Sequence, residues 1–258
     1  MKRVILNLGL LFVVLAVAAQ DTYLAEKFVS SKKDTLNYRY IVPENMQEGQ
    51  QYPLVLFLHG AGERGSDNEK QLTHGGQMFL NPVNREKYPA FVLFPQCPEK
   101  AFWAYPARPD SYSPVRMPQL KEQPPIFQAV KELLDTYLEN PQVDKKRVYI
   151  IGLSMGAMGT YDMISRYPEI FAAAIPICGT VNPTKLNAVK GHDIHVRIFH
   201  GDADDVVPVT GSREAYKTLK SLGVDVEYIE FPGCNHGSWN PAFNYPDFMQ
   251  WLFTQERD

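Results

Sequence analysis

Residues 147–167 read RVYIIGLSMGAMGTYDMISRY, an apolar strand-like run that passes directly into a helical one. The β-branched and aromatic residues before Gly152 predict a strand, and the amphipathic stretch after Ser154 predicts a helix. Ser154 therefore lies on a tight strand-to-helix turn, where Gly152 and Gly156 remove side chains that would clash across it. Such a turn exposes the serine at the sheet edge and directs the first helical N–H groups toward a developing oxyanion. The segment predicts a nucleophile at Ser154, and the alternative is a packing turn of small residues.

Strand-like and helix-like segments alternate along the rest of the chain. Strands are expected at 38–42, 54–58, 91–94, 147–151, 172–177, 196–200 and 226–231, and helices at 126–138, 155–167, 212–222 and 246–253. Apolar strands that alternate with amphipathic helices are typical of a mostly parallel sheet with helices on both faces. Residues 23–58 hold strands with no helix between them, so we expect a hairpin there that forms an antiparallel N-terminal edge. The sequence thus predicts an α/β fold.

The composition of the 258-residue chain is that of a globular protein. It is 45% hydrophobic and 21% charged, which excludes long disordered or collagen-like tracts. The 26 Lys and Arg residues against 29 Asp and Glu residues give a net charge of −3, and no basic block is present. A nucleic-acid partner is therefore not expected.

The N-terminal residues differ in composition from the rest. Lys2 and Arg3 precede an apolar run over residues 4–19, which ends in small residues. This pattern is typical of a secretory signal peptide, and the run is short for a membrane anchor, which needs about 20 apolar residues. We expect a signal peptide at 1–19 and a single mature domain at 20–258. The mature protein would be secreted or periplasmic, with no stable membrane insertion after cleavage.

A serine nucleophile needs a histidine base and an orienting carboxylate. Of the six histidines, His236 follows the last expected strand, which brings it to the sheet edge that Ser154 occupies. His59 and His200 each end an apolar strand before a glycine, so we expect them to brace strand ends. The carboxylate should follow the strand at 196–200. Three acids are candidates there, and periodicity does not choose among them: Asp202, Asp204 and Asp205. A cation site is the alternative for this cluster.

Residues 95–125 break the alternation because they contain eight of the chain's 20 prolines. Proline this dense prevents regular elements, and a long loop inside a domain is usually functional or disordered. Aromatic residues between the prolines, including Trp103 and Tyr105, favour ordered packing. We interpret the segment as an insertion at the catalytic edge. Trp103 and Tyr105, with Trp239 close to His236, are predicted to form an aromatic substrate-binding wall. The alternative is that Trp103 and Trp239 fill a small core under the loop.

Three further stretches carry a family resemblance: LHGAGERG at 58–65, PQCP at 95–98 and IPICG at 175–179. Together with the chain order of Ser154, an aspartate and His236, they resemble the α/β-hydrolase superfamily. Within it, the sequence is similar to the group of secreted carboxylesterase/phospholipase and feruloyl-esterase-like proteins, some of which are labelled predicted peptidases. The resemblance implies an α/β-hydrolase fold. Its HGxxDxxVP motif falls on residues 200–208, which implies that Asp204 is the acid.

The fold and the resemblance together imply an oxyanion hole made of two backbone N–H groups. One belongs to Met155, which follows the nucleophile. The other belongs to the turn after the strand at 54–58, at Ala61, with Gly62 as the alternative. This chemistry requires no metal and no cofactor.

The three cysteines lack the CxxC spacing of zinc sites and are too few for a disulfide scaffold. Cys178 ends the strand after the nucleophile helix, and Cys234 lies two residues before His236, so both are expected near the catalytic edge. A bridge between them, a bridge between Cys97 and Cys178, and three free thiols are all compatible with the sequence.

The expected activity is hydrolysis of carboxylic esters by a serine esterase through an acyl-enzyme. The expected partner is an ester substrate, with feruloyl, p-coumaroyl or acetyl groups on plant cell-wall polysaccharide, or its oligosaccharides, as the favoured class. One alternative is a serine peptidase of prolyl oligopeptidase type, because amide and ester cleavage use the same machinery. Another is a non-catalytic binding protein on a hydrolase fold.

Overall fold

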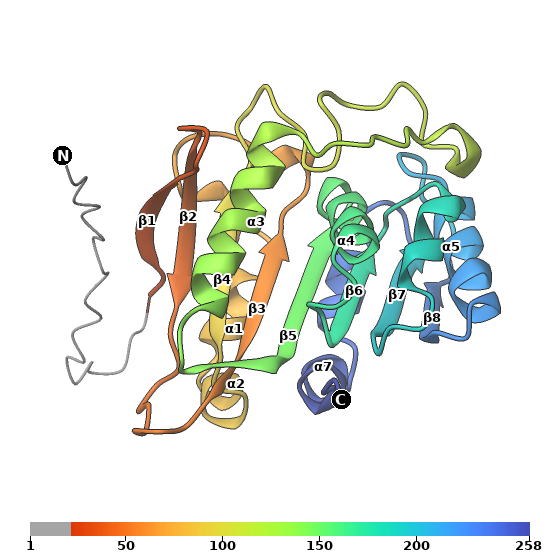
Figure 1. The fold of residues 1–258 in the computed structure, drawn as a ribbon. Helices are drawn as coiled ribbons and strands as arrows, with labels where there is room; N and C mark the ends of the chain where they lie inside the picture. The colour runs from red at the N-terminus through yellow and green to blue at the C-terminus, as the bar shows by residue number, and fades with distance from the viewer. Residues whose placement is uncertain (1–21) are drawn as a thin grey trace.

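One eight-stranded sheet organises the chain, in the order β1-β2-β4-β3-β5-β6-β7-β8 (Figure 1). The structure, a computed structural model, describes residues 22–258, so the predicted signal peptide lies outside the described residues. The strands are β1 (Leu24–Val29), β2 (Thr35–Ile41), β3 (Tyr52–Leu58), β4 (Phe91–Gln96), β5 (Val143–Leu153), β6 (Ala173–Ile177), β7 (His195–Gly201) and β8 (Asp225–Phe231).

The direction of the strands follows the prediction. β1 pairs with β2, and β2 with β4, in antiparallel register. Every pair from β4 to β8 is parallel. The predicted N-terminal hairpin is therefore the antiparallel edge of a mostly parallel sheet, and the expected α/β fold class is confirmed.

Helices cover both faces of the sheet. The α-helices are α1 (Gly76–Leu80), α2 (Pro82–Lys87), α3 (Pro125–Leu138), α4 (Met155–Arg166), α5 (Thr210–Ser221), α6 (Trp239–Phe243) and α7 (Phe248–Thr254). Four short 3-10 helices are η1 (Ala61–Glu63), η2 (Lys70–Leu72), η3 (Pro114–Arg116) and η4 (Pro183–Val189). α3, α4 and α5 lie in front of the sheet in Figure 1, and α1, α6 and α7 pack on the other face. Among residues 22–258, no helix is long and apolar enough to cross a bilayer.

The sheet separates two hydrophobic cores. Successive side chains of a strand point to opposite faces, so a strand covered on both sides must be apolar throughout. All seven residues of β3 are buried. Leu54, Leu56 and Leu58 belong to the core under α3 and α4, whereas Val55 and Phe57 belong to the core under α1 and α7.

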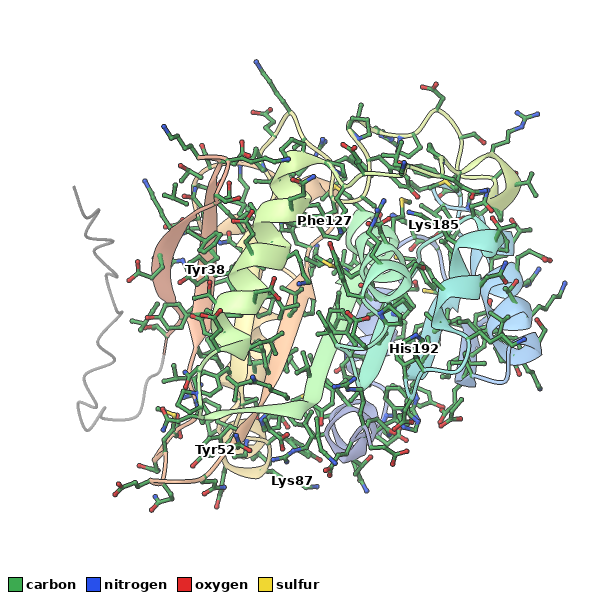
Figure 2. All side chains as sticks on the ribbon, in the orientation of Figure 1. Tyr38, Tyr52, Lys87, Phe127, Lys185 and His192 are labelled. Carbon is green, nitrogen blue, oxygen red and sulfur yellow. The ribbon has the colours of Figure 1, made fainter. Side chains whose placement is uncertain are left out.

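The proline-rich insertion crosses the end of the sheet where the parallel strands β3 and β5 terminate (Figure 1). Of its residues, only those of η3 form a helix after β4 ends and before α3 begins. A buried carboxylate on α4 holds its end in place. Asp162 pairs with Arg166 at 2.8 Å and with Lys185 of η4, which Figure 2 labels, and it accepts a hydrogen bond from Gln123 Nε2 at 3.3 Å. Arg166 in turn donates to the carbonyl of Leu120 at 2.6 Å. The insertion is thus anchored to the helix that begins at Ser154.

Candidate active site

Ser154 occupies a strained turn between the last residue of β5 and the first residue of α4. Its φ of 52° and ψ of −114° lie in a region that non-glycine residues seldom adopt. A Cβ on Gly152 would lie 2.2 Å from the carbonyl oxygen of Gly156, and one on Gly156 would lie 1.9 Å from that of Leu58. Both glycines are therefore required by close backbone approach, as the sequence predicted.

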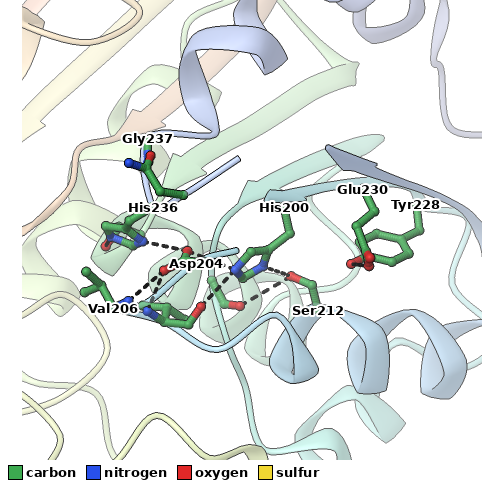
Figure 3. A network of polar contacts seen from close by, with 12 residues as sticks. His200, Asp204, Val206, Ser212, Tyr228, Glu230, His236 and Gly237 are labelled. Atoms are coloured by element: carbon green, nitrogen blue, oxygen red, sulfur yellow. Dashed lines mark hydrogen bonds and ion pairs between the residues drawn. The ribbon is translucent and has the colours of Figure 1, made fainter. Parts of the chain in front are cut away.

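Three loops bring Ser154, His236 and Asp204 into one line of hydrogen bonds. Figure 3 shows the part of this line between His236 and Asp204. Ser154 Oγ lies 2.9 Å from His236 Nε2, and His236 Nδ1 lies 2.7 Å from Asp204 Oδ2. The loops follow β5, β8 and β7, so the three side chains meet at the carboxyl edge of the parallel strands. The side chain of His236 is 18% exposed and that of Asp204 is enclosed. The base is thus accessible while its acid is shielded.

Asp204 is surrounded by hydrogen-bond donors. Its Oδ1 accepts the backbone N–H groups of Val206 and Val207, each at 2.9 Å. Its Oδ2 accepts Nδ1–H of His236 and lies 3.1 Å from Nε2 of His200. Burial raises the pKa of this carboxyl, but the hydrogen bonds from the two histidines and the two amides outweigh burial and hold the pKa below its ordinary value. Asp204 is therefore an anion at neutral pH.

The other two candidate acids lie elsewhere. Asp202 is exposed, and its Oδ1 accepts the backbone N–H of Gly233 at 2.6 Å. Asp205 is exposed as well. Of the three acids after β7, the structure places Asp204 alone against the ring of His236.

His200 has a closer relation to the site than its sequence position indicated. Its Nε2 lies within hydrogen-bond distance of two acceptors, Asp204 Oδ2 and the carbonyl of Val207 at 3.0 Å, so this nitrogen carries the proton. Its Nδ1 then accepts the hydroxyl of Ser212 at 2.7 Å. His200 does end β7, as expected, but it is also a second donor to the acid (Figure 3). The spacing of His200 and Asp204 in the HGxxD motif was the available signal.

The turn after β3 lies beside the serine. Leu58 pairs with Gly152 in the register of β3 and β5, and the first turn of α4 packs directly on the carbonyl groups of Leu58 and His59. Ala61, which begins η1, and Met155, which begins α4, are thus at the same edge. The two predicted oxyanion donors stay a prediction that this placement accommodates.

Comparison with known proteins places the chain in a family. The profile described as phospholipase/carboxylesterase matches residues 40–246, which is more than half of the chain. The chain belongs to this family. The resemblance drawn from the sequence motifs is confirmed, and with it the α/β-hydrolase fold.

Three similar proteins show how far this chain resembles known carboxylesterases and related enzymes. A thermostable esterase of known structure is 38% identical, with a TM-score of 0.83, over 92% of this chain and 64% of that chain. A probable carboxylesterase of Oryza sativa subsp. japonica is 24% identical over 78% of this chain and 87% of its own length. A bifunctional acetylxylan esterase/xylanase of Neocallimastix patriciarum is 35% identical over 81 residues. These residues are 31% of this chain and 12% of that enzyme, so the chain spans only part of some relatives.

Two of the three predicted substrate-binding aromatics of this carboxylesterase-family chain lie in the core. Trp103 is 0% exposed and Tyr105 is 2% exposed, so the prediction of a wall that faces the substrate is wrong for both. Trp103 packs on Phe127 of α3, with ring centroids 6.1 Å apart, and donates Nε1–H to the carbonyl of His59 at 3.0 Å. Both the N–H and the ring of Trp103 thus contact other parts of the protein and do not face a substrate.

The third aromatic, Trp239, remains close to the base. It is partly exposed at the start of α6, and its ring centroid lies 5.5 Å from that of His236 in an edge-to-face arrangement. The centroid of the His74 ring lies 5.0 Å from that of Trp239. Contact of Trp239 with the substrate stays a prediction.

The three cysteines are free thiols in the structure, with Cys97 and Cys178 buried. The ligand atoms of Cys178, Asp204 and His236 lie within 4.8 Å of one another, which is the one metal-like cluster among the described residues. Burial, with a smaller effect of Asp204, raises the pKa of the Cys178 thiol, so it stays protonated. A protonated thiol is a poor metal ligand, and the acid and base are already hydrogen-bonded to each other. The geometry fits a proton relay better than a metal site.

Proposed function

We propose that this chain is a serine esterase that cleaves carboxylic esters through a covalent acyl-enzyme. One observation carries the proposal: the hydrogen-bonded line from Ser154 through His236 to Asp204 on a strained strand-to-helix turn. A serine hydroxyl is a weak nucleophile until a neighbouring base accepts its proton. Family membership supports the same chemistry.

The protonation state of His236 follows from its acid partner. Asp204 is an anion and accepts the proton on Nδ1, so Nε2 presents a lone pair to the hydroxyl of Ser154. When Ser154 Oγ bonds to the ester carbon, its proton passes to Nε2 and the carbonyl oxygen becomes an oxyanion. The intermediate collapses as the C–O bond to the alcohol breaks, and Nε2 returns the proton to the leaving alkoxide.

Deacylation repeats the sequence with water. His236 takes a proton from the water as its oxygen attacks the acyl carbon, and it then protonates Ser154 Oγ as the carboxylic acid leaves. The backbone N–H groups of Met155 and Ala61 would stabilise the oxyanion in both halves. Each such donor is worth about 3 kcal/mol of transition-state stabilisation. No step requires a metal or cofactor.

For the substrate, we propose acyl esters of hydrophilic alcohols, with feruloyl or acetyl groups on plant polysaccharide as the favoured class. A hollow lies against Ala61, and its wall includes charged side chains of both signs: Arg64, Asp67, Lys70 and Glu99. Such a lining favours a polyhydroxylated group over a lipid chain. The matching relative named for acetylxylan esterase activity supports the same class.

We also propose that the protein is exported to the periplasm or the medium. The support is the sequence of residues 1–19, with Lys2 and Arg3 before an apolar run that ends in small residues. Polysaccharide esters would be met there. N-terminal sequencing of the protein recovered from outside the cytoplasm would give a start near residue 20, whereas an intact Met1 would contradict export.

A substrate panel tests the activity directly. Purified protein and its Ser154→Ala variant are assayed with p-nitrophenyl acetate, methyl ferulate, acetylated xylan and short peptide amides. Turnover of the esters by the wild type, lost in Ser154→Ala at an unchanged melting temperature, is the expected result. Turnover of peptides with none of esters would favour the peptidase alternative, and no turnover of any substrate would contradict the proposal.

A further inference from the structure

The turn that holds Ala61 is fixed by side chains that hydrogen-bond to its carbonyl groups. His59 O accepts Nε1–H of Trp103 at 3.0 Å, and Ala61 O accepts Nε–H of Arg64 at 2.8 Å. Between them, Gly60 O lies 2.6 Å from Nδ1 of the His59 ring. Three successive carbonyl groups of the turn are therefore each held by a different side chain.

The ring of His59 can donate at only one place. Its Nε2 accepts the backbone N–H of Cys97 at 2.9 Å, so the proton of the neutral ring is on Nδ1 and is donated to Gly60 O. The residue is 1% exposed, and burial lowers its pKa to about 4, opposed in part by the bond to Gly60. The ring is therefore neutral at working pH, with one donor and one acceptor, and both are used.

The hydrogen bond from His59 to Gly60 O also fixes the direction of the Ala61 N–H, because both groups belong to the same peptide bond. The peptide group is planar and trans, so the C=O of Gly60 and the N–H of Ala61 point in opposite directions. A bond that pulls Gly60 O toward His59 therefore turns the Ala61 N–H away from the core. Gly60 is buried and Ala61 is partly exposed.

We propose that His59 is a positioning residue whose Nδ1–H sets the Gly60–Ala61 peptide so that the Ala61 N–H faces the oxyanion. This inference rests on the proposed esterase function. It also assigns a role to the start of the insertion, because Cys97 sets the tautomer of His59 and Trp103 covers its ring at a centroid distance of 5.0 Å. The same reasoning separates the two candidate donors. Arg64 holds Ala61 O and thereby orients the N–H of Gly62, whereas His59 orients that of Ala61.

Two substitutions of His59 separate positioning from simple packing. In His59→Asn the side-chain N–H₂ can take the place of Nδ1 and donate to Gly60 O. In His59→Gln the side-chain carbonyl can take the place of Nε2 and accept from Cys97, and the donor to Gly60 is lost. Initial rates on p-nitrophenyl acetate give kcat and KM, and thermal unfolding gives the melting temperature of each variant.

We expect kcat of His59→Gln to fall by about tenfold to a hundredfold, part of the loss seen when a whole oxyanion donor is removed. KM should stay within about twofold, because the contact acts on the transition state. His59→Asn should recover most of kcat. A short trifluoromethyl ketone adds reversibly to Ser154, with the hydroxyl proton passing to His236, and its oxygen becomes an oxyanion. Its inhibition constant should rise in His59→Gln by the same factor as kcat falls.

The results that overturn the inference are specific. Equal losses of kcat in His59→Gln and His59→Asn, or a change confined to KM, would show that the ring acts only by packing. A larger loss of kcat at unchanged KM in Arg64→Gln than in His59→Gln would assign the donor to Gly62. Should His59→Gln not fold, Trp103→Phe takes its place. This variant keeps a ring over His59 but removes the hydrogen bond to His59 O. An unchanged kcat in Trp103→Phe would refute the claim that hydrogen bonds to the carbonyl groups of the turn position the Ala61 N–H.

The esterase activity of the wild type distinguishes a failure of the proposed function from a failure of the proposed role of His59. A wild type with no esterase activity contradicts the proposed function, and this inference falls with it. An active wild type with indistinguishable His59 variants contradicts the inference alone.

Discussion

Replacement of Asp204 by asparagine changes one atom and should remove almost all activity. Asp204 accepts four hydrogen bonds, two from backbone amides on Oδ1 and two from histidine rings on Oδ2. Asparagine has one acceptor end and one donor end. Its oxygen must face the amides of Val206 and Val207, which cannot rotate, so its N–H₂ faces the rings of His236 and His200.

The donor end of asparagine forces the wrong tautomer on the base. His236 would relieve the donor–donor contact by moving its proton from Nδ1 to Nε2. Nε2–H would then point at Ser154 Oγ, 2.9 Å away, and could not accept the hydroxyl proton. Loss of the correct tautomer lowers kcat by about 10⁴-fold in hydrolases that use this relay, which corresponds to about 5 kcal/mol.

The assay compares Asp204→Asn with Asp205→Asn, the same chemical change on the adjacent exposed residue. Initial rates on p-nitrophenyl acetate are measured at several pH values, with melting temperatures to show that both variants fold. We expect a loss near four orders of magnitude for Asp204→Asn and a rate within about twofold of wild type for Asp205→Asn. Retention of more than a tenth of wild-type kcat by Asp204→Asn would refute the reasoning, as would a severe loss in Asp205→Asn.

Three further predictions concern stability. Gly156→Ala would place a Cβ 1.9 Å from a backbone carbonyl and should lower the unfolding free energy by about 3 kcal/mol in urea titration, whereas Gly62→Ala meets no atom within 4 Å and should leave it nearly unchanged. Asp162→Asn removes the buried anion from two half-buried cations, Arg166 and Lys185, so we expect a loss of about 3–5 kcal/mol and a fall in Tm of about 6–20 °C; an unchanged Tm would count against this anchor. The pKa of His59 is lowered to about 4, so between pH 6.5 and 4 the unfolded chain binds more protons than the native one, and stability falls as pH falls. His59→Asn should remove on the order of 3 kcal/mol of this pH dependence in urea titrations at pH 7 and pH 4, and parallel curves would contradict it.

The nucleophile turn could be predicted because its determinants are adjacent in sequence. A strand, two glycines around Ser154 and a helix all lie within residues 147–167, and the alternation of apolar segments indicated the parallel sheet. The short helices α1, α2 and α6 could not be predicted in this way. With five or six residues each, they are too short to show a helical period.

The acid and the aromatic residues depended on contacts between distant segments. Asp202, Asp204 and Asp205 are chemically alike in sequence, and what distinguishes Asp204 is its contact with the ring of His236, 32 residues later in the chain. Which aromatic residues of the insertion pack into the core is likewise decided by tertiary contacts. Trp103 is buried because its N–H finds a carbonyl 44 residues earlier in the chain, at His59.

Covalent labelling with a fluorophosphonate probe tests the central claim most directly. The probe reacts with a serine whose hydroxyl is activated by a base, and the labelled peptide is identified by mass spectrometry. We predict one label per folded molecule, on Ser154, with loss of esterase activity in proportion to labelling. Ser154→Ala, and to a large extent Asp204→Asn, should not react. Stoichiometric labelling of a different residue, or full ester turnover by protein labelled at Ser154, would contradict the account.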